Sequence, residues 1–299
     1  MAKVLIVGEI YRESQYFVGA IPAANEVSIA DSLTNIFGSK TLNVARVLSR
    51  LGNDVTFFAR IGMESRVALE TAFADYAIST ERVSPVKTIT GEITVITETS
   101  GSSAMALFRG ANDKVTIEDI EILDKDLAEF DLVYVTTHLA APLLSALVAL
   151  CRDKTKVFID FPNRQAEINL KHITTADFIA PNRQETELML DTKIDSIKSA
   201  FEALQKIRKH FSGNILITLD ADGCVLLQKD SGQPEHFATE AVTASDSAAA
   251  GDIFRAAFVS ELLKSKKIAV AISKALRLAT ASVKIKGVND TINNLDYSI

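Results

Sequence analysis

The sequence predicts an α/β fold in which helices cover both faces of a mainly parallel β-sheet. Short apolar runs rich in β-branched residues alternate along the chain with longer stretches of helical periodicity. Such alternation is typical of parallel strands joined by helical crossovers. One region, residues 87–110, interrupts the alternation with a pattern of its own. In a fold of this class, ligands bind outside the carboxyl ends of the strands.

Six runs are expected to be buried strands because they are short and bounded by turn residues. They are residues 3–8, 54–60, 132–137, 156–161, 177–181 and 214–220. Helical patterns lie between them at residues 42–51, 65–76, 142–152 and 196–210, and two long helices are expected near the C-terminus. We expect residues 1–299 to form a single large domain.

The interrupting region, residues 87–110, predicts a β-hairpin. Apolar residues alternate at Ile89, Ile93 and Val95, a polar turn follows, and a second strand runs through Met105 to Phe108. Together with residues 11–36, we expect this hairpin to form a small β-sheet lid over a cleft. The alternative is an ordinary edge hairpin of the main sheet.

Composition excludes several classes of function. The net charge is −6 and long basic runs are absent, which argues against nucleic acid as a partner. The two cysteines, Cys151 and Cys224, lie far apart with no histidine nearby, so neither a disulfide framework nor a zinc signature is expected. This cysteine usage fits the reducing cytoplasm, which is the expected location.

Two segments resemble targeting or membrane sequences at first sight. The N-terminus has one basic residue and a very short apolar run, so it predicts a first strand rather than a signal peptide. Residues 132–151 are uncharged and about as long as a membrane span. Polar residues 136–138 and Pro142 interrupt them, so we expect a buried strand, a turn and a helix, and no membrane partner.

The stretch DSAAAGDIFRAAF, residues 246–258, carries the clearest chemical signal. Phe254, Phe258 and Leu262 recur at a spacing of four, so a helix is expected to begin near Gly251. The first N–H groups of a helix lack partners and carry the positive end of its dipole.

The residues at this helix start are almost without side chains. Ala249, Ala250 and Gly251 would let an anion approach the free N–H groups closely, which makes a phosphate cradle. Asp252 would stand beside it as a base for a substrate hydroxyl. The alternative is that Asp246 or Asp252 merely caps the helix.

Several motifs, in the expected order, resemble those of the ribokinase-like carbohydrate kinases of the PfkB family. Residues 246–258 resemble the D-T-x-G/A-A-G-D signature. Residues 37–52 resemble G-G-K-x-x-N-x-A, with Ser39 in place of the second glycine. Shorter matches are G-A-N at residues 109–116, N-x-x-E at residues 180–190 and T-L-G-x-x-G at residues 217–227.

The resemblance implies a ribokinase-like three-layer α/β/α fold with a small lid, and a kinase that uses ATP and Mg²⁺. It makes Asp252 the catalytic base and Ala249, Ala250 and Gly251 the anion hole. The acceptor sugar would be bound by Tyr11, Arg12, Glu13, Gly38, Lys40 and Asn43. Asn182 and Glu185 would organise Mg²⁺ mostly through waters, and the nucleotide would contact Asn182, Thr218, Asp220 and Gly223. Analogy with ribokinases adds a K⁺ site around Asp246, Ala248 and Gly287, and a homodimer formed through the lid.

The chain departs from the family pattern mainly on the acceptor side. The usual G-x-x-x-x-D is Gly8 to Glu13 here, with the bulkier Tyr11 and Arg12 inside it. Asp220 replaces the glycine of T-L-G, and Arg255-Ala256 stands where Asn-Gly is frequent. Arg12 either pairs with an anionic group of the acceptor or points to solvent; the sequence favours neither.

The leading hypothesis is an ATP-dependent kinase that phosphorylates a hydroxyl of a small sugar or sugar-like acceptor. One alternative is a nucleoside kinase of the same family. Another is a non-catalytic regulatory protein that binds a sugar or nucleotide on this scaffold. A dinucleotide-dependent oxidoreductase is excluded because the first strand is followed by one glycine where G-x-G-x-x-G is needed. A P-loop motif is also absent.

Overall fold

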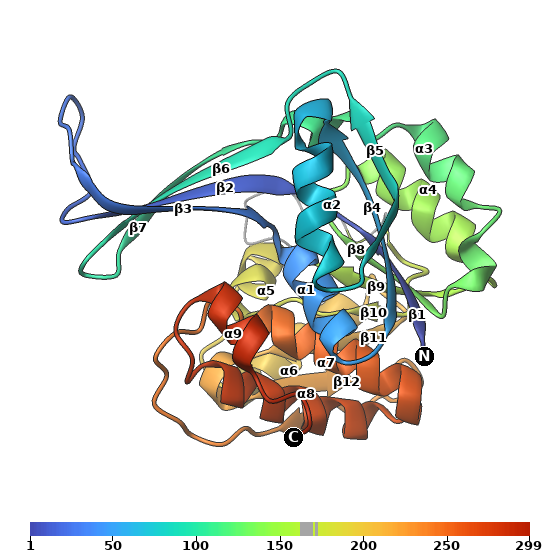
Figure 1. Ribbon diagram of the computed structural model, residues 1–299. Helices are drawn as coiled ribbons and strands as arrows, with labels where there is room; N and C mark the ends of the chain where they lie inside the picture. Colours follow the sequence, from blue (N-terminus) through green and yellow to red (C-terminus); the bar gives the residue numbers. More distant parts are fainter. Residues whose placement is uncertain (162–169, 171–172) are drawn as a thin grey trace.

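The structure is a computed structural model that describes residues 1–161, 170 and 173–299. Its centre is a nine-stranded sheet with the order β13-β12-β11-β10-β9-β8-β1-β4-β5 (Figure 1). The strands are β1 (Lys3–Val7), β4 (Asp54–Gly62), β5 (Ser79–Val86), β8 (Leu132–Thr136), β9 (Lys156–Asp160), β10 (Phe178–Ile179), β11 (Asn214–Thr218), β12 (Cys224–Leu227) and β13 (Glu235–Phe237). The seven strands from β5 to β11 are parallel, and β12 and β13 extend that edge in antiparallel fashion.

Helices cover both faces of this sheet. They are α1 (Lys40–Arg50), α2 (Arg66–Ala74), α3 (Ile117–Leu123), α4 (Ala141–Cys151), α5 (Arg183–Leu190), α6 (Ile197–Arg208), α7 (Ala250–Ser265), α8 (Ile268–Ser282) and α9 (Val288–Asn294). Short 3₁₀ turns are η1 (Met63–Ser65), η2 (Gly110–Lys114), η3 (Leu127–Glu129) and η5 (Asp220–Asp222).

The alternation of side chains along the strands builds two separate cores. In β1, Val4 and Ile6 pack with α1, α7 and α8, whereas Leu5 and Val7 pack with α3, α4 and α6. Because every strand in the middle of the sheet is buried on both faces, these strands have continuous apolar sequences. The predicted three-layer α/β/α fold is confirmed.

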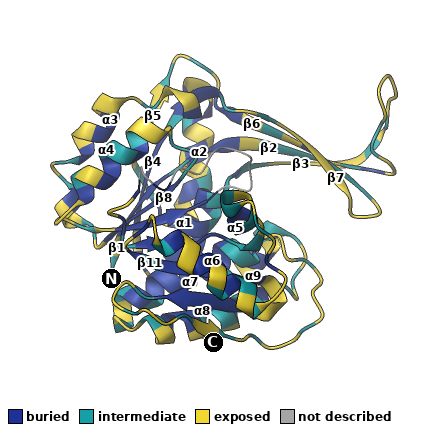
Figure 2. Cartoon of the chain, turned by 180° about the vertical axis from the view of Figure 1, so that it is seen from behind, coloured by how far each residue is buried: buried dark blue, intermediate teal, exposed yellow. Residues whose placement is uncertain are grey.

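The lid is a separate sheet with the order β3-β2-β6-β7. It consists of β2 (Tyr11–Val18), β3 (Ala30–Gly38), β6 (Gly91–Glu98) and β7 (Ser103–Phe108). Two hairpins meet where β2 runs parallel to β6. Figure 1 shows this sheet projecting from the body, and Figure 2 shows that its outer part is mostly exposed. The hairpin at residues 87–110 therefore belongs to a lid and not to the edge of the main sheet.

The six predicted main-sheet strands and the predicted helices are present, with ends shifted by a few residues. Residues 132–151 form β8, a turn and α4, as expected. Within the described ranges, no helix is long and apolar enough to cross a membrane. The strand β5 was not predicted, because it is an edge strand of mostly polar residues that includes Pro85, and neither feature is typical of a buried strand.

Candidate active site

The helix α7 begins where the alanine-rich stretch predicts, with Ala249 as its N-cap residue. One expectation needs correction: the N–H of Ala250 donates to the carbonyl of Ser247 at 3.1 Å and is not free. Among the described residues, the N–H groups of Ala249 and Gly251 have no backbone acceptor. Since the N-terminal end of a helix attracts anions, these two N–H groups remain the candidate anion hole.

Asp252 lies in the first turn of α7 and is 5% exposed. Asn43, in α1, donates from Nδ2 to Asp252 Oδ2 at 2.9 Å. No described residue donates to Oδ1, so this oxygen is open to a ligand. Burial raises the pKa of Asp252 to about 6, although Lys40, Arg255 and the Asn43 hydrogen bond oppose that rise. A carboxylate with such a pKa can accept a proton near neutral pH.

A buried network of charges supports Asp252. Lys40 Nζ lies 3.4 Å from Asp160 Oδ1 and 3.0 Å from Glu185 Oε1. Arg255 Nε lies 2.8 Å from the same Asp160 oxygen, and its Nη2 lies 3.4 Å from Glu185 Oε2. The network thus contains two cations, and Asp252 lies beside it as a third carboxylate. Asp160 and Glu185 are each paired with both cations. Asp252 is thus the carboxylate of the three without a close ion pair to either cation among the described residues.

Asp160 is fully buried at the carboxyl end of β9 and was missed in the sequence. Tyr134, on the neighbouring strand β8, donates its hydroxyl to Asp160 Oδ2 at 2.8 Å. Burial alone would raise the pKa of Asp160, but Arg255 and Lys40 outweigh burial and lower it. An acidic residue that ends an otherwise apolar strand was the signal that could have identified Asp160.

Asn182 and Glu185 form a capping box at the start of α5. Asn182 Oδ1 accepts from the N–H of Glu185 at 2.8 Å, and Glu185 Oε2 accepts from the N–H of Asn182 at 2.7 Å. Glu185 is fully buried, so its two oxygens are held by Asn182, Lys40 and Arg255. This helix cap therefore lies within the buried ionic network.

The main cavity, of about 910 Å³, is lined by residues of the lid, by the first turns of α7 with Asp252, and by residues of α8. Asn182, Thr218, Asp220 and Gly223, which are expected to contact the nucleotide, all line this cavity, and the part they line is called the nucleotide end. Gly223 has a φ of +81°, and a Cβ there would lie 2.1 Å from the carbonyl oxygen of Phe237, so glycine is required. The Asp220 side chain is 81% exposed and lies 3.7 Å from Arg183 Nε. The same cavity is also lined by apolar residues that the sequence did not indicate: Val242, Ala244, Leu276, Ala279 and Val283.

The three residues expected around a monovalent cation do come together. Asp246 accepts from the N–H of Ala248 at Oδ1 and from the N–H of Gly287 at Oδ2, both at 2.9 Å. The contacts between them use two backbone N–H groups and the Asp246 carboxylate. Among the described residues, no group of three or more histidine, cysteine, aspartate or glutamate side chains could hold a metal ion.

The part of the cavity below the lid, where the acceptor is expected to bind, is called the acceptor end. Tyr11, Lys40, Ile93, Met105 and Leu107 line it, and Glu13 packs beside Gly38, with its Oε2 2.6 Å from where a Cβ of Gly38 would stand. Burial raises the pKa of Glu13, opposed by Arg46.

Arg12 does not join the residues of the acceptor end. In β2 it alternates with Tyr11 and Glu13, so it lies on the opposite face of the lid. Its side chain is 55% exposed, and its Nη1 lies 3.9 Å from Glu92 Oε1. Of the two interpretations that the sequence left open, the structure favours the solvent-facing one, and the idea of an anionic acceptor held by Arg12 is corrected accordingly.

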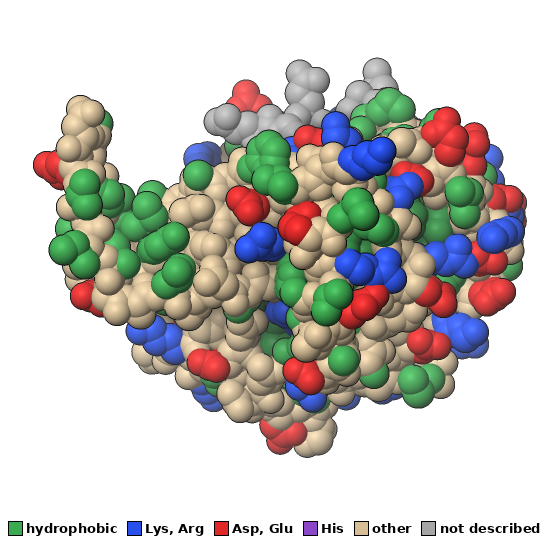
Figure 3. Space-filling model, turned by 45° about the horizontal axis from the view of Figure 1, so that its top comes forward, with side chains coloured by type: hydrophobic (Ala, Val, Ile, Leu, Met, Phe, Trp, Pro, Cys, Tyr) green, Lys and Arg blue, Asp and Glu red, His purple; other side chains and the backbone are tan. Residues whose placement is uncertain are grey.

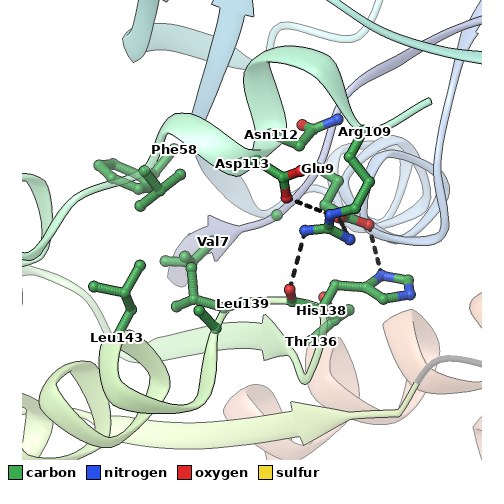
Figure 4. A pocket seen from close by; sticks show the side chains of 13 residues that line it. Val7, Glu9, Phe58, Arg109, Asn112, Asp113, Thr136, His138, Leu139 and Leu143 are labelled. Carbon is green, nitrogen blue, oxygen red and sulfur yellow. Dashed lines mark hydrogen bonds and ion pairs between the residues drawn. The ribbon is translucent and has the colours of Figure 1, made fainter. Parts of the chain in front are cut away.

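A second cavity, of about 300 Å³, adjoins the acceptor end (Figure 4). Glu9, Arg109 and His138 gather at one end of it, and Val7, Phe58 and Leu143 lie at the other. Glu9, Thr136 and His138 line both cavities and so stand between them.

Sequence reasoning missed Glu9, Arg109 and His138 as a group because they come from three distant segments. Glu9 follows β1, Arg109 follows β7, and His138 follows β8. The one available signal was that Glu9 and His138 each come just after a strand of the parallel sheet, where ligands bind.

The family model described as "pfkB family carbohydrate kinase" matches residues 1–294 of the chain. A ribokinase of Haemophilus influenzae is 27% identical over 296 residues, covering 94% of this chain and 95% of that protein. A deoxyribokinase of Salmonella typhi is 22% identical over 290 residues, covering 94% and 92%. The solved structure of Arabidopsis thaliana ribokinase complexed with ribose and ATP is 20% identical and has a TM-score of 0.87, covering 100% of this chain and 97% of that one.

Proposed function

Because the chain belongs to the pfkB family of carbohydrate kinases, we propose that it transfers the γ-phosphate of ATP to a hydroxyl of a small sugar or sugar-like acceptor. The observation that carries this proposal is Asp252: a buried carboxylate with a pKa of about 6, one free oxygen, and the free N–H groups of a helix start beside it. Base and anion hole are the two parts that phosphoryl transfer to an alcohol requires.

The proposed proton path follows from the hydrogen bonds. Asn43 holds Asp252 Oδ2, so the acceptor hydroxyl donates its proton to Oδ1 as its oxygen bonds to the γ-phosphorus. The bond from the γ-phosphorus to the bridging oxygen breaks, and ADP leaves. The phosphate oxygens would lie against the N–H groups of Ala249 and Gly251, where the helix dipole favours negative charge. Lys40 is 24% exposed and lines the cavity, so its ammonium can also face the phosphate.

The residues near the nucleotide end fit ATP with Mg²⁺ carried by the phosphates. Apolar side chains that line the cavity offer a surface for the adenine base. The described residues contain no group of three or more histidine, cysteine, aspartate or glutamate side chains that could bind a metal ion directly. This suits Mg²⁺, which keeps most of its waters, and Asn182, which lines the cavity, would hold one of them. The role expected for Glu185 is corrected, because Glu185 is fully buried and both of its oxygens are already paired within the protein. When bound, Mg²⁺ neutralises charge on the transferring phosphate. A K⁺ ion near Asp246, Ala248 and Gly287 remains a proposal, tested by comparing activity in K⁺ and Na⁺.

Turnover tests the proposal directly. Sugars, sugar acids and nucleosides are screened with ATP and Mg²⁺, and ADP release is measured for the native chain and for Asp252→Asn. We expect release with at least one acceptor and a loss of about 10³-fold or more in the variant. A flat response across the panel would count against a kinase. A variant that remains fully active would remove Asp252 as the base.

Two alternatives are decided by the same screen. A nucleoside acceptor is favoured by one observation, the apolar side chains of Ile93, Met105 and Leu107 on the lid, which offer a surface for a base. Phosphorylation of nucleosides in preference to sugars would select this alternative. A regulatory protein without activity would bind sugar or nucleotide in a calorimeter yet release no ADP with any acceptor.

We also propose that the lid mediates a homodimer. Hydrophobic side chains gather on the projecting sheet (Figure 3). Leu33 and Tyr16, which pair across β3 and β2 on the face that faces away from the cavity, are both exposed. An exposed apolar patch of this kind marks an interaction surface. Light scattering of the native chain is expected to give twice the monomer mass, and a Leu33→Asp variant is expected to be monomeric.

A further inference from the structure

His138 and Glu9 form a hydrogen-bonded pair that the phosphoryl-transfer machinery does not use. The Nδ1 of His138 lies 2.6 Å from Glu9 Oε2, and Arg109 Nη1 lies 2.7 Å from Glu9 Oε1. Figure 4 shows all three side chains converging at one end of the second cavity. Glu9 is 7% exposed, so its charge is kept inside the protein by these two partners.

The ionised carboxylate of Glu9 determines which ring nitrogen of His138 donates a hydrogen bond. Burial raises the pKa of Glu9, but the hydrogen bond and charge of His138, with Arg109 and Tyr11, outweigh burial and lower it. A carboxylate only accepts hydrogen bonds, so His138 must donate from Nδ1. In the neutral ring, the other nitrogen, Nε2, then carries a lone pair that accepts.

The Nε2 of His138 is buried and has no hydrogen-bond partner among the described residues. A buried polar atom without a partner is destabilising, so each such atom needs an explanation. The ring lines the same cavity as Asp252, Lys40 and Tyr11. A ligand in the acceptor end of that cavity is the natural source of the missing donor.

We propose that His138 is a specificity-determining residue that accepts a hydrogen bond from one hydroxyl of the acceptor, with Glu9 as the residue that positions its ring. This inference rests on the proposed kinase function and specifies its acceptor site. Asp252 accepts the proton of the reacting hydroxyl. The hydroxyl that donates to His138 is therefore a different hydroxyl of the same acceptor molecule.

The charges at this end favour a hydroxyl over an anion. Arg109 is held by Glu9, by Asp113 and by the carbonyl of His138, at 3.2 Å in the last case. Its positive charge is therefore balanced within the protein, and the ionised Glu9 would repel an anionic group. A neutral polyhydroxy acceptor satisfies Nε2 without placing a second negative charge beside Glu9.

The experiment compares single-hydroxyl deletions. The best acceptor from the ADP-release screen and its monodeoxy derivatives are assayed with the native chain, with His138→Ala and with His210→Ala. His210 follows α6 and is exposed, so it is the matched control. For the native chain and the control, we expect one deoxy derivative other than that of the reacting hydroxyl to lose about 10-fold or more in kcat/KM, because a site built for a hydroxyl rejects the analogue lacking it.

In His138→Ala, this one discrimination is expected to fall to about two-fold or less, while discrimination at the other hydroxyls persists. A purely structural role for His138 would instead lower kcat/KM for all acceptors by a common factor and leave the ratios unchanged. Unchanged ratios would overturn the inference while leaving the kinase function in place. Absence of turnover by the native chain would remove the proposed function and the inference together.

A second measurement does not depend on the His138 variant folding. The chain has four histidines, so ¹⁵N-histidine labelling gives a small set of imidazole signals. Titration of Asp252→Asn, which binds without turnover, with the acceptor is expected to shift the Nε2 signal of His138. The deoxy derivative identified above should leave that signal in place. An Nε2 signal that does not respond to the full acceptor would overturn the proposal.

Discussion

Asn43 and Asp252 stand 209 positions apart in the chain, yet Asn43 Nδ2 lies 2.9 Å from Asp252 Oδ2. The contact joins the first turns of α1 and α7, which pack side by side in the same core. Because Ser39 caps α1 by accepting from the N–H of Leu42 at 2.9 Å, this helix start is well defined. The hydrogen bond turns Oδ1 of Asp252 into the basic atom of the site.

The rate should therefore depend on pH through Asp252. Its pKa is raised to about 6 by burial, and only the ionised form can accept the acceptor proton. We expect kcat/KM to be level above about pH 7 and to fall about tenfold per unit well below pH 6. Initial rates measured across this range test it. A rate that stays level to about pH 5 would contradict the assigned base.

The same carboxylate should lower the stability of the native protein. The pKa of Asp252 is raised in the folded chain above the ordinary value of 3.8, so ionisation opposes folding. The penalty is complete above about pH 6, shrinks as the pH falls, and vanishes below about pH 4. At pH 7 the free energy of unfolding of Asp252→Asn is expected to exceed that of the native chain by about 2–3 kcal/mol. Urea denaturation at pH 7 and pH 4 tests this, and an equal advantage at both values would refute it.

The start of α7 could be predicted because its small residues, its acid and its phenylalanine spacing lie in one continuous stretch, DSAAAGDIFRAAF. The ionic network could not. Lys40, Asp160, Glu185 and Arg255 lie on four elements, and no local pattern says which charges will meet after folding. Lid strands followed from alternation, whereas the edge strand β5 lacked the apolar signal. The direction of Arg12 depended on the register of β2, which the sequence left undetermined.

Arg255 is expected to be the most costly member of the network to remove. It is 2% exposed and faces both Asp160 and Glu185, so Arg255→Met leaves two buried carboxylates with Lys40 alone. Breaking a buried pair in this way costs about 3–5 kcal/mol. The free energy of unfolding from urea titration measures it. Arg277→Met in α8, where the arginine is exposed, is the control and should change stability by less than about 0.5 kcal/mol.

Gly251 is expected to be sensitive for reasons of space. A Cβ there would stand 2.9 Å from Arg255 Nη1 and would also occupy the approach to the anion hole. Gly251→Ala should therefore displace either the guanidinium or the phosphate, and we expect kcat/KM to fall about 10²-fold, as for a misplaced reacting group. Gly232→Ala serves as control, because no atom lies within 4 Å of its added Cβ. Equal activity of the two variants would show that the space above Gly251 is not used.

Arg12 is expected to have no part in acceptor binding, although its position between Gly8 and Glu13 made it a candidate for that role in the sequence. Its guanidinium lies on the outer face of the lid, 3.9 Å from Glu92, and both side chains are about half exposed. An exposed ion pair at such a distance contributes about 0–1 kcal/mol. Arg12→Ala should thus leave the KM for the acceptor within about two-fold of the native value and stability within about 1 kcal/mol. Tyr11→Phe, one residue away on the inner face, is the matched comparison, because Tyr11 lines the cleft and its hydroxyl helps to hold Glu9. A KM that rises in Arg12→Ala but not in Tyr11→Phe would show that the lid presents its other face to the acceptor.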